Sequence, residues 1–201
     1  MKMQLYLLRH GSSFANERHL VCGRADYPLS EAGQRQTEIV CAYLNRFAFS
    51  RIYVSPLSRA RETIASLKTE APVVVEPELL ELDTGDVSEL VFEDLWEIDA
   101  RYRRPWTAPD LRYPGGETFG EMIARIIGWY DRTSPTWGPD DIVLIVGHEG
   151  TLRSIFLKLE KLTVQSYPTF PIGNCDFLRF EIYPDGSNSF QHVFLSELEE
   201  P

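Results

Sequence analysis

The sequence has few cysteines, a deficit of positive charge and no long hydrophobic run. Its three cysteines, Cys22, Cys41 and Cys175, are widely spaced and form no CxxC pair. This excludes a disulfide framework and a cysteine zinc site, and it indicates reduced thiols in a cytoplasmic protein. No apolar stretch has the length of a membrane-spanning helix. Twenty basic residues stand against thirty acidic ones, a formal net charge of −10, so neither nucleic acid nor a membrane surface is an expected partner.

The length and composition fit one globular domain covering residues 1–201. Hydrophobic residues make up 43% of the 201 residues and charged residues 25%, which is ordinary usage for a folded chain. We expect the acidic end, residues 197–201, to fray.

Short apolar runs alternate with helical patterns along the chain. Buried strands are predicted at Gln4–Leu8, Ile52–Val54, Val73–Val75 and Ile142–Val146, and a hairpin of two further strands at Phe177–Ile182 and Phe190–Leu195. Helical spacing of apolar residues covers 40–47, 119–130 and 152–159, and Ser55-Pro56 is typical of a helix start running towards Leu67. The predicted fold is α/β, a three-layer α/β/α arrangement with a mostly parallel central sheet.

The segment from about residue 84 to 116 departs from this alternation. It has no strand signal and gathers rings and cations: Trp96, Tyr102, Trp106 and Tyr113 beside Arg101, Arg103, Arg104 and Arg112. We expect a small helical, cap-like insertion over one end of the sheet. Two interpretations stay open, an amphipathic surface helix with arginine stems lying along it or a cap that faces the substrate. A substrate-facing cap would suit an apolar or ring-bearing leaving group.

Polar side chains follow the predicted strands where each strand ends. Arg9 and His10 come directly after the first strand, Arg59 after the second, Glu81 after the third and His148 after the fourth. In parallel α/β sheets, ligands bind in the crevice beyond the carboxyl ends of the strands. Charged groups there need partners if they are buried, so these five side chains are expected to meet around a ligand.

This set favours a tetrahedral oxyanion. Two arginines would repel a divalent cation, so no metal site is expected, whereas each guanidinium can donate a fork of hydrogen bonds to phosphate oxygens. A histidine with a free ring nitrogen can attack phosphorus in line, and Gly11 allows close backbone approach to the ligand. Glu81 is the candidate general acid for the leaving oxygen.

Six blocks resemble the histidine phosphatase superfamily, also called the phosphoglycerate-mutase-like family. The blocks are Leu7–Gly11 followed by Asn16, Gly23 with Pro28–Gly33, Ser55–Thr63, Leu80–Asp86, Pro114–Thr118 and Gly147–Gly150. An RHG tripeptide alone is weak support, but six blocks in order are specific. The resemblance extends over most of the chain. It is strongest to the phosphatase branch, that of the α-ribazole phosphatases and broad-specificity phosphatases.

The resemblance implies a role for each matching residue. His10 would be the nucleophile that becomes phosphohistidine, and Glu81 would donate the proton and later act as the base for water. His148 would be a further catalytic residue that binds the phosphate. The remaining implied substrate or phosphate contacts are Arg9, Asn16, Gly23, Arg59 and Glu149. Neither a metal nor an organic cofactor is implied. Glu117, Cys22, Asn174 and Cys175 are weaker candidates for lining the site.

The sequence departs from the family pattern beside Glu81 and His148. Thr84 stands where an aromatic residue is expected, and Val87-Ser88-Glu89 stands where a Trp-Glu-Gly-like sequence is expected. These changes alter the residues expected on the leaving-group side of the pocket. Glu149 adds an anion close to the phosphate site.

Three functions are consistent with these motifs. The first is a metal-independent phosphomonoesterase that acts on a small phosphorylated metabolite through phosphohistidine on His10. The second is phosphoglycerate mutase-type phosphoryl transfer, which the short spacing of 67 positions between Glu81 and His148 disfavours because mutases of this resemblance carry a longer insertion. The third is a non-catalytic phosphate-binding domain, which would predict a damaged motif. A monomer or a homodimer is expected.

Overall fold

A six-stranded mixed sheet forms the centre of the protein, whose computed structural model describes residues 2–198. The strands are β1 (Met3–Arg9), β2 (Arg51–Val54), β3 (Val73–Val75), β4 (Ile142–Gly147), β5 (Phe177–Ile182) and β6 (Asn188–Val193). Their order is β3-β2-β4-β1-β5-β6. The pairs β1–β4, β2–β4 and β2–β3 are parallel, and β5 pairs antiparallel with both β1 and β6. The parallel half of the sheet and the C-terminal hairpin are as predicted.

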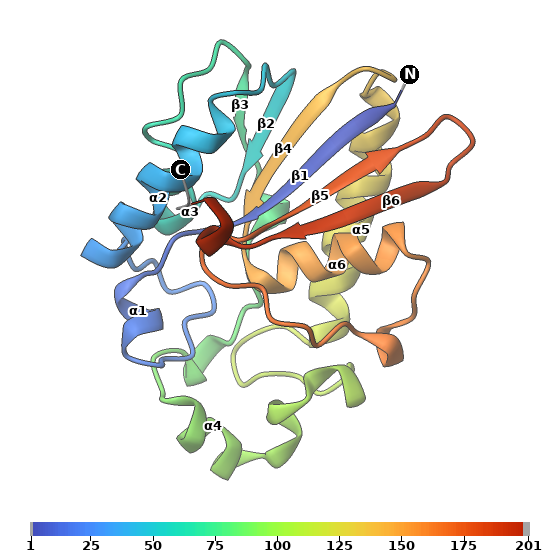
Figure 1. Ribbon diagram of the computed structural model, residues 1–201. Coiled ribbons are helices and arrows are strands. Elements are labelled where there is room, and N and C mark those ends of the chain that lie inside the picture. The colour runs from blue at the N-terminus through green and yellow to red at the C-terminus, as the bar shows by residue number, and fades with distance from the viewer. Residues whose placement is uncertain (1, 199–201) are drawn as a thin grey trace.

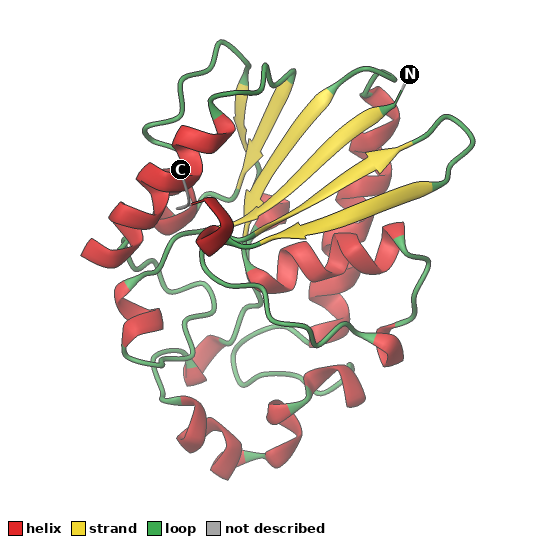
Figure 2. Cartoon of the chain, in the orientation of Figure 1, coloured by secondary structure: helices red, strands yellow, loops and turns green. Residues whose placement is uncertain are grey.

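Helices cover both faces of the sheet. They are α1 (Phe14–Glu17), α2 (Glu31–Leu44), α3 (Ser58–Thr63), α4 (Phe92–Ile98), α5 (Phe119–Thr133) and α6 (Glu149–Leu159). Figures 1 and 2 show α2 and α3 on one side of the strands and α5 and α6 on the other. Two separate hydrophobic clusters, one on each face, fill the spaces between helices and sheet. The three-layer α/β/α architecture is confirmed.

Helix α5 illustrates how the sequence specifies these layers. The hydroxyl of Thr118 accepts from the backbone N–H of Glu121, and the Glu121 carboxylate accepts from the Thr118 N–H, which completes a capping box. Met122 and Ile126 lie one turn apart and are fully buried against the sheet. Truncating either to alanine is expected to cost about 2–5 kcal/mol of stability because a cavity remains.

Three local expectations were wrong. The helix after β2 begins at Ser58 rather than at Ser55-Pro56, because Asp26 from another segment accepts from the Ser58 N–H at 2.6 Å. The strand Val73–Val75 exists but its side chains are 42–49% exposed, because β3 is an edge strand and β-branched residues favour strands without requiring burial. Phe47 lies beyond the end of α2 and packs its ring against Tyr6, 5.1 Å between centroids.

The segment from about residue 84 to 116 forms a cap beyond the carboxyl ends of the strands (Figure 1). It consists of α4 and 3-10 turns at Gly85–Val87, Ala100–Arg103 and Pro105–Thr107. Its own small core holds Val21, Val87, Leu95, Tyr102 and Tyr113. This packing fixes the cap over the sheet edge where the functional motifs end.

Within residues 2–198, no helix is both long enough and apolar enough to cross a bilayer. The end expected to fray is described only in part. Glu197 and Leu198 belong to a final 3-10 turn, and residues 199–201 lie outside the described part of the chain.

Candidate active site

The ends of β1 and β4 bring two histidines together. The ring centroids of His10 and His148 are 5.1 Å apart with an interplanar angle of 62°. His10 is 4% exposed and His148 is fully buried. The backbone N–H of His10 donates to the carbonyl of Gly147 at 3.0 Å, so pairing of the two parallel strands continues up to the histidines and fixes their separation.

The hydrogen bond of His10 determines which ring nitrogen is free. Its Nδ1 lies 2.7 Å from the carbonyl oxygen of Gly11. A carbonyl oxygen only accepts, so Nδ1 carries the proton and Nε2 keeps its lone pair. Burial, together with the guanidinium groups of Arg59 and Arg9, holds the pKa of His10 well below its usual range. At neutral pH this ring is therefore a neutral imidazole with a free Nε2.

His148 lies deeper than His10 and does not line the cavity. Its Nε2 lies 2.7 Å from the hydroxyl oxygen of Ser55. Its Nδ1 is buried and has no hydrogen-bond partner among the described residues. Burial, followed by the nearby Arg59 and His10, holds the pKa of His148 well below its usual range. The Ser55 hydroxyl thus forms a hydrogen bond with this histidine and does not cap the start of α3.

Arg59 reaches the site from α3 with 1% of its surface exposed. Its Nη2 donates to the carbonyl of Gly23 at 2.8 Å and its Nη1 to that of Ala25 at 2.9 Å. Gly23 has a φ of +47°, and a Cβ there would lie 2.1 Å from the Thr84 hydroxyl oxygen. Only glycine fits this backbone position, so Gly23 contributes a carbonyl that holds Arg59.

Arg9 is shared between the site and a neighbouring carboxylate. Its Nη1 donates to the carbonyl of Ile172 and lies 3.2 Å from Glu149 Oε2. The other oxygen of Glu149 lies 2.5 Å from Nη2 of Arg153. Glu149 therefore lies in the first turn of α6 and bridges two arginines.

Two asparagines lie beside His10. The Asn16 side-chain oxygen accepts from the N–H of Ser13 at 3.0 Å and from its hydroxyl at 2.9 Å, which caps α1. Nδ2 of Asn174 donates to the carbonyl of His10 at 2.9 Å and lies 3.4 Å from Asn16 Oδ1. Both asparagines line the cavity, so each combines a structural bond with a place at the site.

Glu81 projects into the same cavity from the loop after β3. Its Oε1 accepts from the N–H of Leu82 at 2.9 Å, and its Oε2 accepts from the N–H of Gly150, at the start of α6, at 3.2 Å. A Cβ on Gly150 would lie 2.3 Å from Oε1. The carboxylate is thus held from both sides against the first turn of α6.

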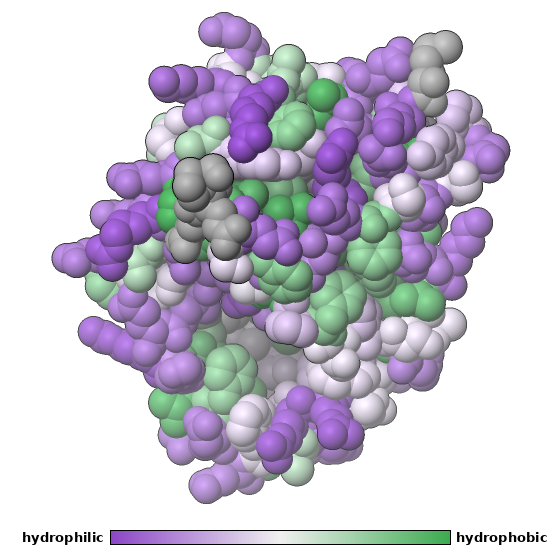
Figure 3. Space-filling view, viewed as in Figure 1, coloured by the Kyte–Doolittle hydropathy of each residue, from purple (hydrophilic) through white to green (hydrophobic). Residues whose placement is uncertain are grey.

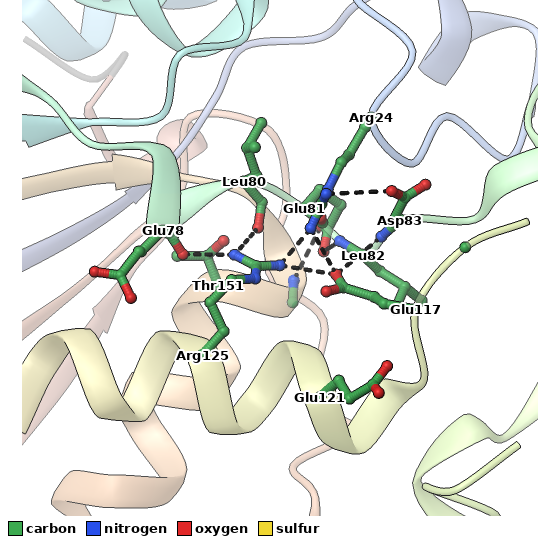
Figure 4. A network of polar contacts seen from close by, with 12 residues as sticks. Arg24, Glu78, Leu80, Glu81, Leu82, Asp83, Glu117, Glu121, Arg125 and Thr151 are labelled. Carbon is green, nitrogen blue, oxygen red and sulfur yellow. Dashed lines mark hydrogen bonds and ion pairs between the residues drawn. The ribbon is translucent and has the colours of Figure 1, made fainter. Parts of the chain in front are cut away.

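A network of charged side chains fixes the loop that carries Glu81 (Figure 4). Arg24 donates to the Glu81 carbonyl at 3.2 Å, and Arg125 of α5 donates to the carbonyl of Leu80 at 3.0 Å. Both arginines contact Oε1 of Glu117, at 3.1 and 2.8 Å. Glu117 therefore lies behind the loop as its anchor.

The cavity has a volume of about 530 Å³ and joins these groups to the cap. Arg9, His10, Asn16, Arg59, Glu81 and Glu149 line one end. The other end is lined mainly by cap and neighbouring rings, including Phe92, Trp96, Tyr102, Trp106, Tyr113 and Tyr167. A space-filling view shows the recess between the sheet and the cap, with hydrophobic side chains at its edge (Figure 3). The segment from about residue 84 to 116 therefore faces the cavity, which agrees with its interpretation as a cap and not with that of a surface helix alone.

The cap arginines do not all turn inward. Arg103 lines the cavity, whereas Arg101 pairs with Asp99 at 2.6 Å and Arg112 pairs with Glu121. Cys22 also lines the cavity and is half-buried. Over residues 2–198, no three His, Cys, Asp or Glu side chains come together as metal ligands would.

Comparison with known proteins identifies the family to which this arrangement belongs. The sequence model of the histidine phosphatase superfamily, branch 1, matches residues 5–193. The chain belongs to the histidine phosphatase superfamily. Its sheet, its paired histidines and the order of its motifs are those expected from the resemblance.

Relatives in this superfamily include both phosphatases and mutases. The adenosylcobalamin/α-ribazole phosphatase of Salmonella typhimurium is 33% identical over 165 residues, which are 78% of this chain and 79% of that protein. A 2,3-bisphosphoglycerate-dependent phosphoglycerate mutase of Methylobacterium radiotolerans is 32% identical over 183 residues, 86% of each chain. The solved structure of a putative α-ribazole-5′-P phosphatase from Escherichia coli superposes with a TM-score of 0.82 at 26% identity, covering 95% of this chain and 96% of the other.

Some relatives are much longer than this histidine phosphatase domain. A bifunctional protein of Mycobacterium tuberculosis is 33% identical over 151 residues, which are 73% of this chain but 38% of that protein. The chain thus spans well under half the length of these mycobacterial relatives.

Sequence reasoning missed the residues that support the histidine phosphatase motifs. Arg24, Arg125, Arg153 and Tyr167 lie outside or at the edge of the recognised blocks. Arg125 and Arg153 interrupt the apolar patterns of α5 and α6 on faces that are otherwise buried. An arginine at such a position needs a partner. Its place within an apolar pattern was therefore the signal that could have predicted these buried polar contacts.

Proposed function

We propose that this histidine phosphatase is a metal-independent phosphomonoesterase that works through a phosphohistidine on His10. The observation that carries the proposal is the convergence of a neutral His10 with a free Nε2, two arginines and Glu81 around one end of a single cavity. The phosphatase relatives support the hydrolase activity. Removing one buried electrostatic donor at such a site typically costs on the order of 10²–10³ in rate.

In the first step Nε2 of His10 attacks the phosphorus atom of the ester. The P–O bond to the leaving group breaks as the P–N bond forms, and Glu81 gives its proton to the departing oxygen. Arg9 and Arg59 bind the phosphoryl oxygens. When the Ser55 hydroxyl donates to Nε2 of His148, the proton of that ring is on Nδ1. The buried Nδ1, which has no partner among the described residues, then donates a further hydrogen bond to the phosphoryl group.

In the second step water attacks the phosphohistidine. Glu81, now ionised, takes a proton from the attacking water, the P–N bond breaks, and the electron pair returns to Nε2 of His10. Inorganic phosphate leaves the arginines, and Glu81 is again protonated. Glu81 thus acts as acid in one step and base in the next, which its place at the cavity wall permits.

The experiment measures phosphate release from p-nitrophenyl phosphate and from a panel of phosphorylated metabolites in the presence of EDTA. The proposal expects EDTA-resistant turnover in the wild type and its loss in His10→Ala. His192→Ala, which replaces a histidine of β6 outside the cavity lining, is the matched control. Release that persists in His10→Ala overturns the assignment of the nucleophile.

A mutase activity is the second candidate, because a phosphoglycerate mutase is 32% identical over 86% of this chain. A mutase must shield phosphohistidine from water and return the phosphoryl group to a bound intermediate. Conversion of 3-phosphoglycerate to 2-phosphoglycerate without phosphate release would favour it. A folded protein that binds phosphate yet performs neither reaction would favour the non-catalytic alternative.

A further inference from the structure

One wall of the cavity runs from the phosphate end to the cap through a chain of contacts. Glu149 lies 3.2 Å from Arg9 and 2.5 Å from Arg153. The Arg153 guanidinium lies over the ring of Tyr167, 5.7 Å from its centroid, and Tyr167 stacks on Trp106 at 5.7 Å and 18°. A leaving group that extends from the phosphate into the cap therefore passes a carboxylate first and aromatic rings next.

The charged groups near the ester leave little positive charge for a second anion. The cavity-lining arginines are Arg9, Arg59, Arg103 and Arg153. Glu149 occupies two of them, Arg9 and Arg153, and Arg59 is turned onto two backbone carbonyls. Arg103 is exposed and lies over Trp96, 4.8 Å from its centroid, so only a group that reaches the far end of the cavity meets it.

The far end of the cavity carries uncharged rings. Burial raises the pKa of Tyr113 and of Tyr167 well above the usual range of a phenol, so both rings are neutral at neutral pH. Trp96 and Trp106 are half-buried, and both line the cavity. Such surfaces favour flat apolar groups, since aromatic pairs add stacking to area burial.

We propose that the preferred substrate class is phosphomonoesters with a ring-bearing leaving group that has no carboxylate or second phosphate beside the ester. Glu149 disfavours the second anion, because it already pairs with two arginines that would otherwise bind that anion and adds a like charge in a partly desolvated cavity. The cap rings bind the ring of the leaving group. This inference rests on the phosphatase activity proposed above and makes Glu149 its specificity-determining residue.

The test compares kcat/KM for three primary alkyl phosphates whose leaving groups have similar intrinsic reactivity. They are 2-phenylethyl phosphate, glycerol 3-phosphate and 3-phosphoglycerate. The first carries a ring, the second is neutral without one, and the third resembles the second but adds a carboxylate. The expected order of kcat/KM is ring-bearing, then neutral, then carboxylate-bearing, with each step on the order of tenfold.

Two variants separate the contributions of charge and ring to two ratios of kcat/KM. The charge ratio compares glycerol 3-phosphate with 3-phosphoglycerate, and the ring ratio compares 2-phenylethyl phosphate with glycerol 3-phosphate. Glu149→Gln removes the anion and releases both arginines, so the preference for glycerol 3-phosphate over 3-phosphoglycerate is expected to narrow about tenfold. Trp106→Leu, with Trp96→Leu as its companion, is expected to narrow the preference for 2-phenylethyl phosphate roughly fivefold without moving the charge ratio. Glu97→Gln, an exposed acid of α4 outside the cavity lining, is the control and is expected to leave both ratios unchanged.

The outcomes distinguish this inference from the proposed function. His10-dependent hydrolysis with 3-phosphoglycerate preferred, or a charge ratio unmoved by Glu149→Gln, overturns the inference and leaves the phosphatase intact. An unmoved ring ratio in both tryptophan variants also overturns it. Absence of hydrolysis of all three esters and of p-nitrophenyl phosphate overturns the proposed function, and the inference with it.

Discussion

Oε1 of Glu117 lies 2.8 Å from Nη2 of Arg125, and this ion pair lies directly behind the loop that carries Glu81. The same oxygen accepts from the backbone N–H of Asp83 at 3.0 Å. The pair therefore ties the general-acid loop to α5 on the side away from the cavity. Glu117 is a positioning residue, since it acts on the reaction through Glu81.

Glu117→Gln is expected to impair acid catalysis more than binding. Poor leaving groups depend most on protonation, so kcat/KM for an alkyl phosphate should fall about tenfold more than kcat/KM for p-nitrophenyl phosphate. Steady-state kinetics with both esters measure this difference. Glu121→Gln, which retains a capping side chain at an exposed position, serves as the control. An equal loss on both esters would mean that Glu117 has only a general structural role.

Arg59→Lys is expected to reduce kcat by about 10²-fold. Lysine cannot reproduce a planar guanidinium that is anchored on two carbonyls while facing the phosphoryl group. Arg61→Lys on the same helix is the comparison, because Arg61 is exposed and does not line the cavity. Equal activities of the two variants would contradict the placement of Arg59 at the phosphate.

Gly23→Ala is expected to destabilise the fold by about 3 kcal/mol or more. The left-handed backbone alone costs an alanine about 1–2 kcal/mol, and the new Cβ would also meet Thr84. Gly186→Ala shares the positive φ but enters open space, so it should cost only the backbone contribution. Chemical denaturation of both variants measures the difference, and similar free energies of unfolding would show that the site around Gly23 relaxes.

The buried histidines are expected to make stability pH-dependent. The folded-state pKa values of His10 and His148 lie well below 6.5, whereas the unfolded chain titrates near that value. As pH falls below about 6.5, the unfolded state therefore binds protons that the folded state does not, and stability is lost by up to about 1.4 kcal/mol per pH unit for each histidine.

Unfolding free energies measured between about pH 7 and pH 5 test this dependence. His148→Gln should show a shallower loss than the wild type, because one of the two titrations is removed. Met122→Ala, a buried substitution that removes no titratable group, should retain the wild-type slope. Identical slopes for His148→Gln and the wild type would contradict the neutral, buried state of His148.

Short-range patterns predicted the layers of the fold and the convergence of its motifs. The capping box at Thr118 and Glu121 fixed the start of α5 correctly, because both of its hydrogen bonds are local in sequence. The strand-end rule placed His10 next to His148, because parallel strands end at the same edge of the sheet. Both predictions depend on the neighbours of each residue along the chain or along the strand.

Long-range partners were not accessible in this way. Ser55 had the chemistry of a helix N-cap, but its hydroxyl is bound to a histidine 93 positions away. Arg24 and Arg125 meet at Glu117 only because three separate loops and helices converge behind Glu81. No local pattern encodes such a meeting. The valines of β3 were assigned to the interior because strand propensity does not distinguish an edge strand from a central one.

The central claim is that Nε2 of His10 becomes phosphorylated during turnover. Rapid acid-free quenching of the enzyme with p-nitrophenyl phosphate, followed by peptide mass spectrometry, locates the phosphoryl group. We expect one alkali-stable, acid-labile phosphoryl group on the peptide that carries His10, formed no more slowly than phosphate is released. A turning-over enzyme with no phosphoryl group on His10, or with one on another residue, would contradict the account.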